Sequence, residues 1–174
     1  MRAPDVLNVL ARLDEAGVPV WVDGGWGVDA LLACQTRSHG DLDLVVARAD
    51  CARAEEALAP LGFRRAPDAE PGLPTRLVLR APDGRQVDLH PVVFDGHGNG
   101  WQELPRGGWG VYPAEGLTGR GEVGGRTARC ITPELQLRHH LGYEPSEADR
   151  RDMRLLAARF GVSLPPSWRE NERP

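Results

Sequence analysis

Two aspartates spaced by one residue, Asp41 and Asp43 in the run DLDLVV, are the residues whose types and spacing most clearly indicate chemistry. The alternation of polar and apolar residues predicts a strand over 41–46, in which side chains two positions apart point to the same face. Two carboxylates on one face repel each other unless a cation lies between them, and a magnesium ion, which prefers oxygen ligands, would satisfy both. The alternative is a strand edge that faces solvent and binds nothing.

The run RQVDLHPVVF, positions 85–94, is predicted to add a third carboxylate. Its alternation places Gln86, Asp88 and His90 on one face of a strand and the intervening apolar residues on the other. Three carboxylates around one or two metal ions can activate a hydroxyl group and stabilise a pyrophosphate leaving group in an in-line displacement. Asp88 is therefore a candidate third carboxylate beside Asp41 and Asp43, and His90 shares its face of the strand.

Gly24 and Gly25, in the run VDGGWG, lie between a predicted strand and a predicted helix. Glycines at a helix start leave backbone amides open to an anion such as a triphosphate, although an ordinary tight turn would use the same pair. Arg37 is a candidate to bind triphosphate oxygens, or else a solvated surface arginine. His39 is interpreted as a structural, hydrogen-bonding histidine rather than a catalytic one. All 21 basic residues are arginine, so no lysine is available for phosphate contacts.

The elements that must position these residues follow from apolar periodicity and from helix start and stop signals. A helix over 5–16 ends at Gly17, a buried strand covers 18–22, and a short helix covers 26–33. Asp50 is expected to cap a helix over 51–61, and a PDG turn joins strands 76–81 and 85–94 into a hairpin. The chain is completed by a glycine-rich rim with short strands over 95–125, a last strand over 126–131, and helices over 133–143 and 147–160.

Composition limits the class of protein. At 174 residues the chain can form one compact unit, and its net charge of −4 and pI near 5.7 argue against binding that depends on neutralising nucleic-acid phosphates. The sequence has no apolar run of membrane-spanning length and no signal-peptide pattern, so a cytoplasmic protein without membrane contact is expected. Cys34, Cys51 and Cys130 lack metal-ligand spacing and are expected to be reduced thiols.

The order of these features resembles the nucleotidyltransferases of the polymerase-beta-like superfamily: a strand, GGW, a short helix, R-x-H-x-D-L-D-L, and then a strand with V-D-L-H-P. More narrowly, the chain is similar to the lincosamide nucleotidyltransferases, with the aminoglycoside nucleotidyltransferases next. The runs DGGWGVDAL, DLHPV, CITPELQLRHHLGY and DRRD extend the resemblance over nearly the whole chain. It implies an α+β fold in which a mixed sheet is flanked by helices. The nucleotidyltransferase domain would cover 1–131, a small helical part packed on it 132–165, and a loose tail 166–174.

The resemblance also implies a role for each candidate residue. Gly24 and Gly25 would hold the triphosphate, Asp41 and Asp43 would bind magnesium, and Asp88 would be both the third metal carboxylate and the general base. Trp26 is expected to pack in the core rather than against the nucleotide. The candidate substrate contacts are His90, His139 and Tyr143. In the family, substrate and nucleotide contacts also come from the region of His140, Asp149 and Asp152, and the roles of these three residues are left open. An amphipathic helix face accounts for the last two equally well.

The implied function is Mg²⁺-dependent transfer of a nucleoside monophosphate, AMP from ATP or the equivalent from another nucleoside triphosphate, to a hydroxyl of a small antibiotic. A lincosamide is the first expectation; an aminoglycoside, another hydroxylated metabolite or a protein hydroxyl are the alternatives. A non-enzymatic alternative is an inactive nucleotide-binding scaffold, which has no physical need for three mutually repelling carboxylates. The family makes a homodimer an expectation. The rim segments 66–74 and 95–125 depart from the relatives and leave the identity of the drug open.

Overall fold

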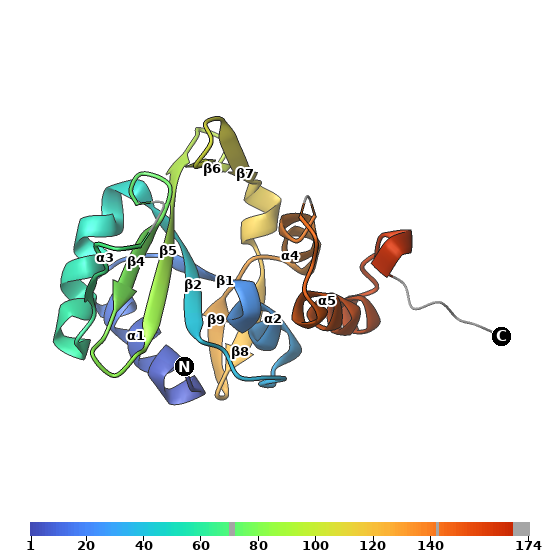
Figure 1. The fold of residues 1–174 in the computed structure, drawn as a ribbon, viewed down its shortest axis with the longest axis horizontal. Helices are drawn as coiled ribbons and strands as arrows, with labels where there is room; N and C mark the ends of the chain where they lie inside the picture. Colours follow the sequence, from blue (N-terminus) through green and yellow to red (C-terminus); the bar gives the residue numbers. More distant parts are fainter. Residues whose placement is uncertain (70–71, 142, 169–174) are drawn as a thin grey trace.

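A computed structural model describes residues 1–69, 72–141 and 143–168 and shows a mixed sheet with helices on both faces (Figure 1). The helices are α1 (Ala3–Glu15), α2 (Gly24–Leu32), α3 (Cys51–Leu58), α4 (Pro133–His139) and α5 (Glu147–Phe160), with short 3-10 helices η1 (Arg48–Asp50), η2 (Ala59–Leu61), η3 (Ala114–Leu117) and η4 (Pro166–Trp168). The strands are β1 (Val20–Asp23), β2 (Asp41–Ala47), β3 (Arg64–Arg65), β4 (Leu77–Arg80), β5 (Gln86–Phe94), β6 (Gly100–Glu103), β7 (Trp109–Tyr112), β8 (Arg120–Val123) and β9 (Arg126–Arg129).

The main sheet has the strand order β1-β2-β5-β4-β3, and the β6–β7 hairpin extends it from the end of β5. Strands β2 and β5 are parallel, whereas β1 and β4 pair antiparallel with their neighbours. The register places Asp43 directly beside Asp23 on one side and beside Asp88 on the other. Three neighbouring strands therefore bring three carboxylates into one row.

The alternation predicted for the two central strands is confirmed. Leu42 and Leu44 are fully buried in the core, as are Val87 and Leu89, whereas Asp41 is only partly buried. Each buried branched side chain of this kind contributes about 1.5–3 kcal/mol to folding, so the apolar face holds the strand in register. A slip by one residue would place the carboxylates in the core.

Helix α2 begins directly after the first strand because Asp23 caps it. Asp23 Oδ1 accepts a hydrogen bond of 2.7 Å from the Gly24 amide, and Gly24 adopts a φ of +57° that favours glycine. The helix is apolar on nearly all sides, and Trp26 is 2% exposed, so the expectation that this residue packs in the core is confirmed. Helix α2 lies between the sheet and the C-terminal helices α4 and α5 (Figure 1).

The C-terminal region differs from its prediction in two places. Helix α4 ends at His139 instead of 143, because the last turn tightens into a bond of 3.1 Å from the Leu141 amide to the Arg138 carbonyl, and Pro145 follows soon after. The tail was expected to be loose from 166, but η4 forms there and Trp168 is 6% exposed against the core. Residues 169–174 lie outside the described part of the chain. No helix within the described residues is long and apolar enough to cross a membrane.

Candidate active site

Asp41 and Asp43 lie at the start of β2, where the structure brings them together as predicted. Asp43 Oδ1 lies 3.0 Å from Nε2 of His90, and the Asp43 side chain keeps 25% of its surface exposed. Burial, followed by the negative charges of Asp43 and Asp88, raises the pKa of Asp41. The site thus carries an excess of negative charge that a cation would relieve.

Asp88 lies beside Asp43 in the predicted position, but its side chain is only 2% exposed and both of its oxygens have donors. Oδ2 forms an ion pair with Nη2 of Arg76, and Oδ1 accepts a hydrogen bond of 2.9 Å from Nε2 of Gln86. As a general base, Asp88 therefore has to loosen one of these contacts before it can take a proton.

The donor chemistry fits a magnesium ion held by two carboxylates. Among the described residues, no group of three or more His, Cys, Asp or Glu side chains could hold a metal ion. Magnesium in phosphate-transfer sites is usually bound by one or two carboxylates together with substrate phosphates, and Asp41 with Asp43 matches that pattern. The predicted third ligand, Asp88, is engaged by Arg76.

The glycine pair touches the carboxylates and the loop that follows α2. A side chain at Gly24 would overlap the Asp43 carboxylate, and one at Gly25 would overlap the ring of His39 and lie 2.8 Å from Nη2 of Arg37. The amide of Gly24 is already used by Asp23. Glycine at position 24 therefore allows the close approach of the Asp43 carboxylate and the left-handed backbone conformation. The phosphate-binding amides predicted here must come from the rest of the first turn of α2.

Arg37 and His39 are held by carboxylates on two helices. Nε and Nη2 of Arg37 contact Oδ2 of Asp152 at 3.0 and 2.8 Å, and Asp152 is 2% exposed. His39 hydrogen-bonds Asp29, which also accepts a bond of 2.7 Å from the Thr36 hydroxyl. Burial raises the pKa of Asp29, but its hydrogen bonds with His39 and Thr36 lower it by more. His39 thus has the contacts of a structural histidine, and Arg37 is oriented from α5.

Asp23 and Tyr112 belong to the site and were not predicted. The Tyr112 hydroxyl donates to Asp23 Oδ2 at 3.2 Å, and Nδ1 of His139 lies 3.8 Å from the same oxygen. Burial raises the pKa of Asp23, but the hydrogen bond with His139 and the charge of His90 lower it by more, so Asp23 is held as a carboxylate. His139, a predicted substrate contact, is thereby placed at the carboxylate row. An aspartate directly before a helix is a standard cap signal and could have identified Asp23.

Other C-terminal candidates have local partners. His140 Nδ1 hydrogen-bonds the Gln136 carbonyl at 2.7 Å, and its Nε2 lies 3.5 Å from Asp149 Oδ1. Asp149 also forms a capping box with Ser146 at the start of α5. Tyr143 is 52% exposed, and its ring contact is with His140. The structure therefore links Tyr143 to the surface of the helical part and gives it no contact with the carboxylate row.

The rim hairpin reaches the site through Gln102 on β6. Its Nε2 donates to the Thr75 carbonyl at 2.9 Å and lies 3.3 Å from Nδ1 of His90. Burial lowers the pKa of His90, but its hydrogen bond with Asp43 and the nearby carboxylates raise it by more. His90 thus bridges the rim to Asp43, and its two ring nitrogens are both engaged. That arrangement suits a residue that orients Asp43.

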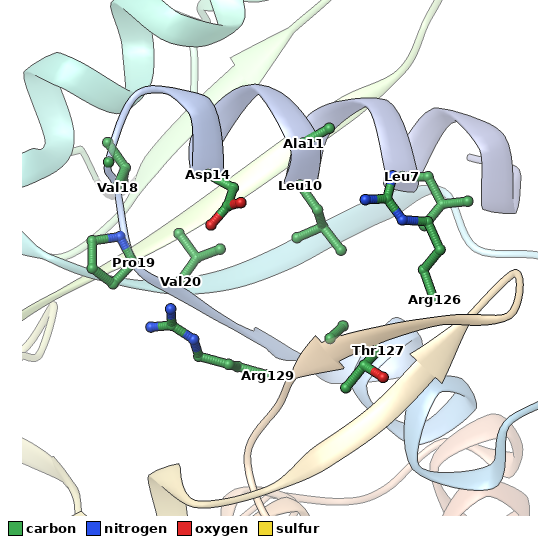
Figure 2. Close-up of a pocket in the computed structure, with 12 residues that line it drawn as sticks. Leu7, Leu10, Ala11, Asp14, Val18, Pro19, Val20, Arg126, Thr127 and Arg129 are labelled. Carbon is green, nitrogen blue, oxygen red and sulfur yellow. The ribbon is translucent and has the colours of Figure 1, made fainter.

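A separate cavity of about 300 Å³ lies between α1, β1 and β9 (Figure 2). Apolar side chains such as Leu7, Leu10 and Val20 line it, with Arg126 and Arg129 from β9 beside them. Its lining includes none of the predicted site residues. The cavity is therefore separate from the row formed by Asp23, Asp43 and Asp88.

Comparison with known protein families and sequences gives consistent matches. A family model described as aminoglycoside-2''-adenylyltransferase matches residues 5–156. A lincosamide resistance protein from Staphylococcus haemolyticus is 28% identical over 152 residues, which cover 87% of this chain and 92% of that protein. A 2''-aminoglycoside nucleotidyltransferase from Klebsiella pneumoniae is 29% identical over 123 residues, which cover 71% of this chain and 63% of that protein.

Solved structures share the fold. The crystal structure of a lincosamide antibiotic adenylyltransferase with lincomycin bound has a TM-score of 0.77 at 28% identity, covering 89% of this chain and 96% of that one. The crystal structure of ANT(2'')-Ia in complex with adenylyl-2''-tobramycin has a TM-score of 0.67 at 21% identity, covering 90% and 88% of the two chains. The predicted fold class, a mixed sheet with helices in the nucleotidyltransferase arrangement, is confirmed, as is the resemblance read from the motifs.

Proposed function

The chain belongs to the aminoglycoside-2''-adenylyltransferase family and is a nucleotidyltransferase, and we propose that it transfers AMP from ATP to a hydroxyl group of a lincosamide antibiotic, with Mg²⁺ at Asp41 and Asp43. The single observation that carries the proposal is the row of Asp23, Asp43 and Asp88 across three strands, with Gly24 directly against Asp43. This arrangement places the start of a helix, which attracts phosphate, next to carboxylates that suit a metal ion.

Four parts of the site, namely Asp41 with Asp43, His90, the first turn of α2 and Arg37, have a part in binding the metal ion and the nucleotide. Asp41 and Asp43 hold the metal ion, which when bound supplies positive charge to the triphosphate and the departing pyrophosphate. His90 donates to Asp43 and keeps that carboxylate oriented. The first turn of α2, after Gly24, binds phosphate oxygens, and Arg37 lies beside it.

The transfer step needs a base for the acceptor hydroxyl. The acceptor oxygen forms a bond to the α-phosphorus, the bond to the bridging oxygen of pyrophosphate breaks, and the hydroxyl proton passes to a carboxylate. Asp88 is the proposed base because it lies beside Asp43 in the register. One of its two contacts, the hydrogen bond from Gln86 or the ion pair with Arg76, has to loosen for the carboxylate to accept that proton.

The lincosamide is proposed as acceptor because the resistance protein from Staphylococcus haemolyticus is matched over 92% of its length. An aminoglycoside is the second candidate, because the family model carries an aminoglycoside description, although the Klebsiella pneumoniae relative is matched over only 63% of its length. A cytoplasmic location and a homodimer remain predictions from the sequence.

The test is an incubation of the protein with ATP or GTP, Mg²⁺ and a panel of lincosamides and aminoglycosides, read by mass spectrometry. We expect lincomycin or clindamycin to gain the mass of one AMP, and we expect the Asp43→Asn protein to give no product. A nucleotide adduct on an aminoglycoside, with none on either lincosamide, would move the acceptor to the second candidate. No adduct on any drug would contradict the proposed function.

A further inference from the structure

Arg76, the partner of Asp88, has no assigned part in nucleotide transfer. It lies just before β4, the strand that pairs antiparallel with β5, and its Nη2 forms an ion pair with Asp88 Oδ2. The Asp88 side chain is 2% exposed and that of Arg76 is 31% exposed. The carboxylate is thus buried, while the cation that neutralises it reaches solvent.

We propose that Arg76 is a resident counter-cation of the carboxylate row, which occupies Asp88 and weakens metal binding at Asp41 and Asp43 in the nucleotide-free protein. The inference rests on the proposed metal site at those two aspartates. The new element is that Arg76 supplies a positive charge to Asp88, the carboxylate that would otherwise be free to act as a third metal ligand.

The positive charge of Arg76 lies close enough to Asp41 and Asp43 to affect a metal ion bound there. Asp43 lies beside Asp88 in the parallel register, so the Arg76–Asp88 ion pair is one strand away from the proposed ligands. A cation bound at Asp41 and Asp43 would therefore be repelled by Arg76 and attracted by Asp88.

The same ion pair accounts for the way the carboxylates are arranged. Arg76 contacts one oxygen of Asp88 and Gln86 donates a hydrogen bond to the other, so both oxygens of this carboxylate already have partners. Within the described residues, no set of three potential ligands comes together around a metal position. Removing the guanidinium would leave Asp88 buried and uncompensated, which is costly unless another cation takes its place.

The experiment is a titration of the nucleotide-free protein with Mn²⁺, followed by electron paramagnetic resonance. Arg76→Met should bind Mn²⁺ more tightly than the wild type, on the order of tenfold, because one positive charge beside the site is gone. Arg76→Lys, which keeps the charge, should stay near the wild type. Arg65→Met is the matched control, because it removes an arginine of the same sheet whose partner is the surface carboxylate of Glu55.

The tighter Mn²⁺ binding of Arg76→Met must depend on Asp88. The double variant Arg76→Met with Asp88→Asn removes both charges and should lose the tighter binding. If Arg76→Met is too unstable to titrate, its melting temperature should rise more on addition of Mn²⁺ than that of the wild type. An equal or smaller rise, or unchanged Mn²⁺ affinity in the folded variant, contradicts the inference.

The outcomes separate this inference from the proposed function. If the wild type binds Mn²⁺ and Asp43→Asn does not, the metal site stands, and an unchanged affinity in Arg76→Met overturns the role of Arg76 alone. If neither the wild type nor Arg76→Met binds Mn²⁺, the metal site at Asp41 and Asp43 is overturned together with the inference.

Discussion

Gly24→Ala should separate the backbone role of this glycine from its contact with Asp43. Gly24 has a φ of +57°, and an added side chain would overlap the Asp43 carboxylate. The left-handed conformation alone costs an alanine about 1–2 kcal/mol. The overlap must in addition displace Asp43, and a shift of about 1 Å at a reacting group can lower turnover about a hundredfold.

Gly125→Ala is the matched control for this prediction. Gly125 has a φ of +79° in the β8–β9 turn, and a side chain there would meet nothing within 4 Å. Gly125→Ala should lose about 1–2 kcal/mol in urea unfolding, because it places alanine in the left-handed region, and Gly24→Ala should lose at least as much, because its side chain also overlaps Asp43. Only Gly24→Ala should lose drug-modifying turnover, measured by mass spectrometry under saturating ATP. If the two variants have equal turnover, the close approach of Gly24 to Asp43 is not needed for activity, and the proposed role of this contact in the active site is refuted.

Three further predictions test other parts of the site. Asp88→Asn should lower turnover by about a hundredfold to ten-thousandfold while nucleotide binding, measured by calorimetry, persists, and His90→Asn should be milder; a folded but inactive His90→Asn beside a normal Asp88→Asn would transfer the base to the histidine. Asp41→Asn should stabilise the metal-free protein at about pH 7, because the pKa of Asp41 is raised in the folded state. The free-energy cost of charged Asp41 in the folded protein is absent below the ordinary pKa of 3.8 and grows as the pH rises through the pKa of Asp41 in the folded protein. A gain in urea stability of Asp41→Asn that persists at low pH would therefore show that this cost is not its cause. Asp152→Asn should cost about 1.5–3 kcal/mol in stability, because it removes the charged partner of Arg37, and a loss no larger than that of a surface variant such as Glu56→Gln would argue against that contact.

The carboxylate row shows how far the sequence can predict the site. The two-residue spacing of Asp41 and Asp43 fixes their common face, and the alternation in β5 does the same for Asp88, because side-chain period in a strand is local. Which strand lies beside which is not local. The parallel register of β2 with β5, which places Asp43 next to Asp88, follows from packing across the whole sheet.

Partners of the site residues were harder to predict than the residues themselves. Arg76 reaches Asp88 across a hairpin, and Asp152 reaches Arg37 from a helix 115 positions away. Such contacts depend on tertiary arrangement and leave no mark in spacing or periodicity. Asp23 is the exception, since its place before a glycine-led helix is a local cap signal, and that signal also identifies a residue of the carboxylate row.

The most direct test of the central claim is the release of pyrophosphate from ATP, followed by phosphorus NMR, in the presence and absence of lincomycin. The account predicts Mg²⁺-dependent release of one pyrophosphate for each modified drug molecule, with none in the absence of the drug and none from Asp43→Asn. Pyrophosphate release by Asp43→Asn at the wild-type rate, or release by the wild type that does not require Mg²⁺, would contradict a nucleotidyltransferase site built on Asp41 and Asp43.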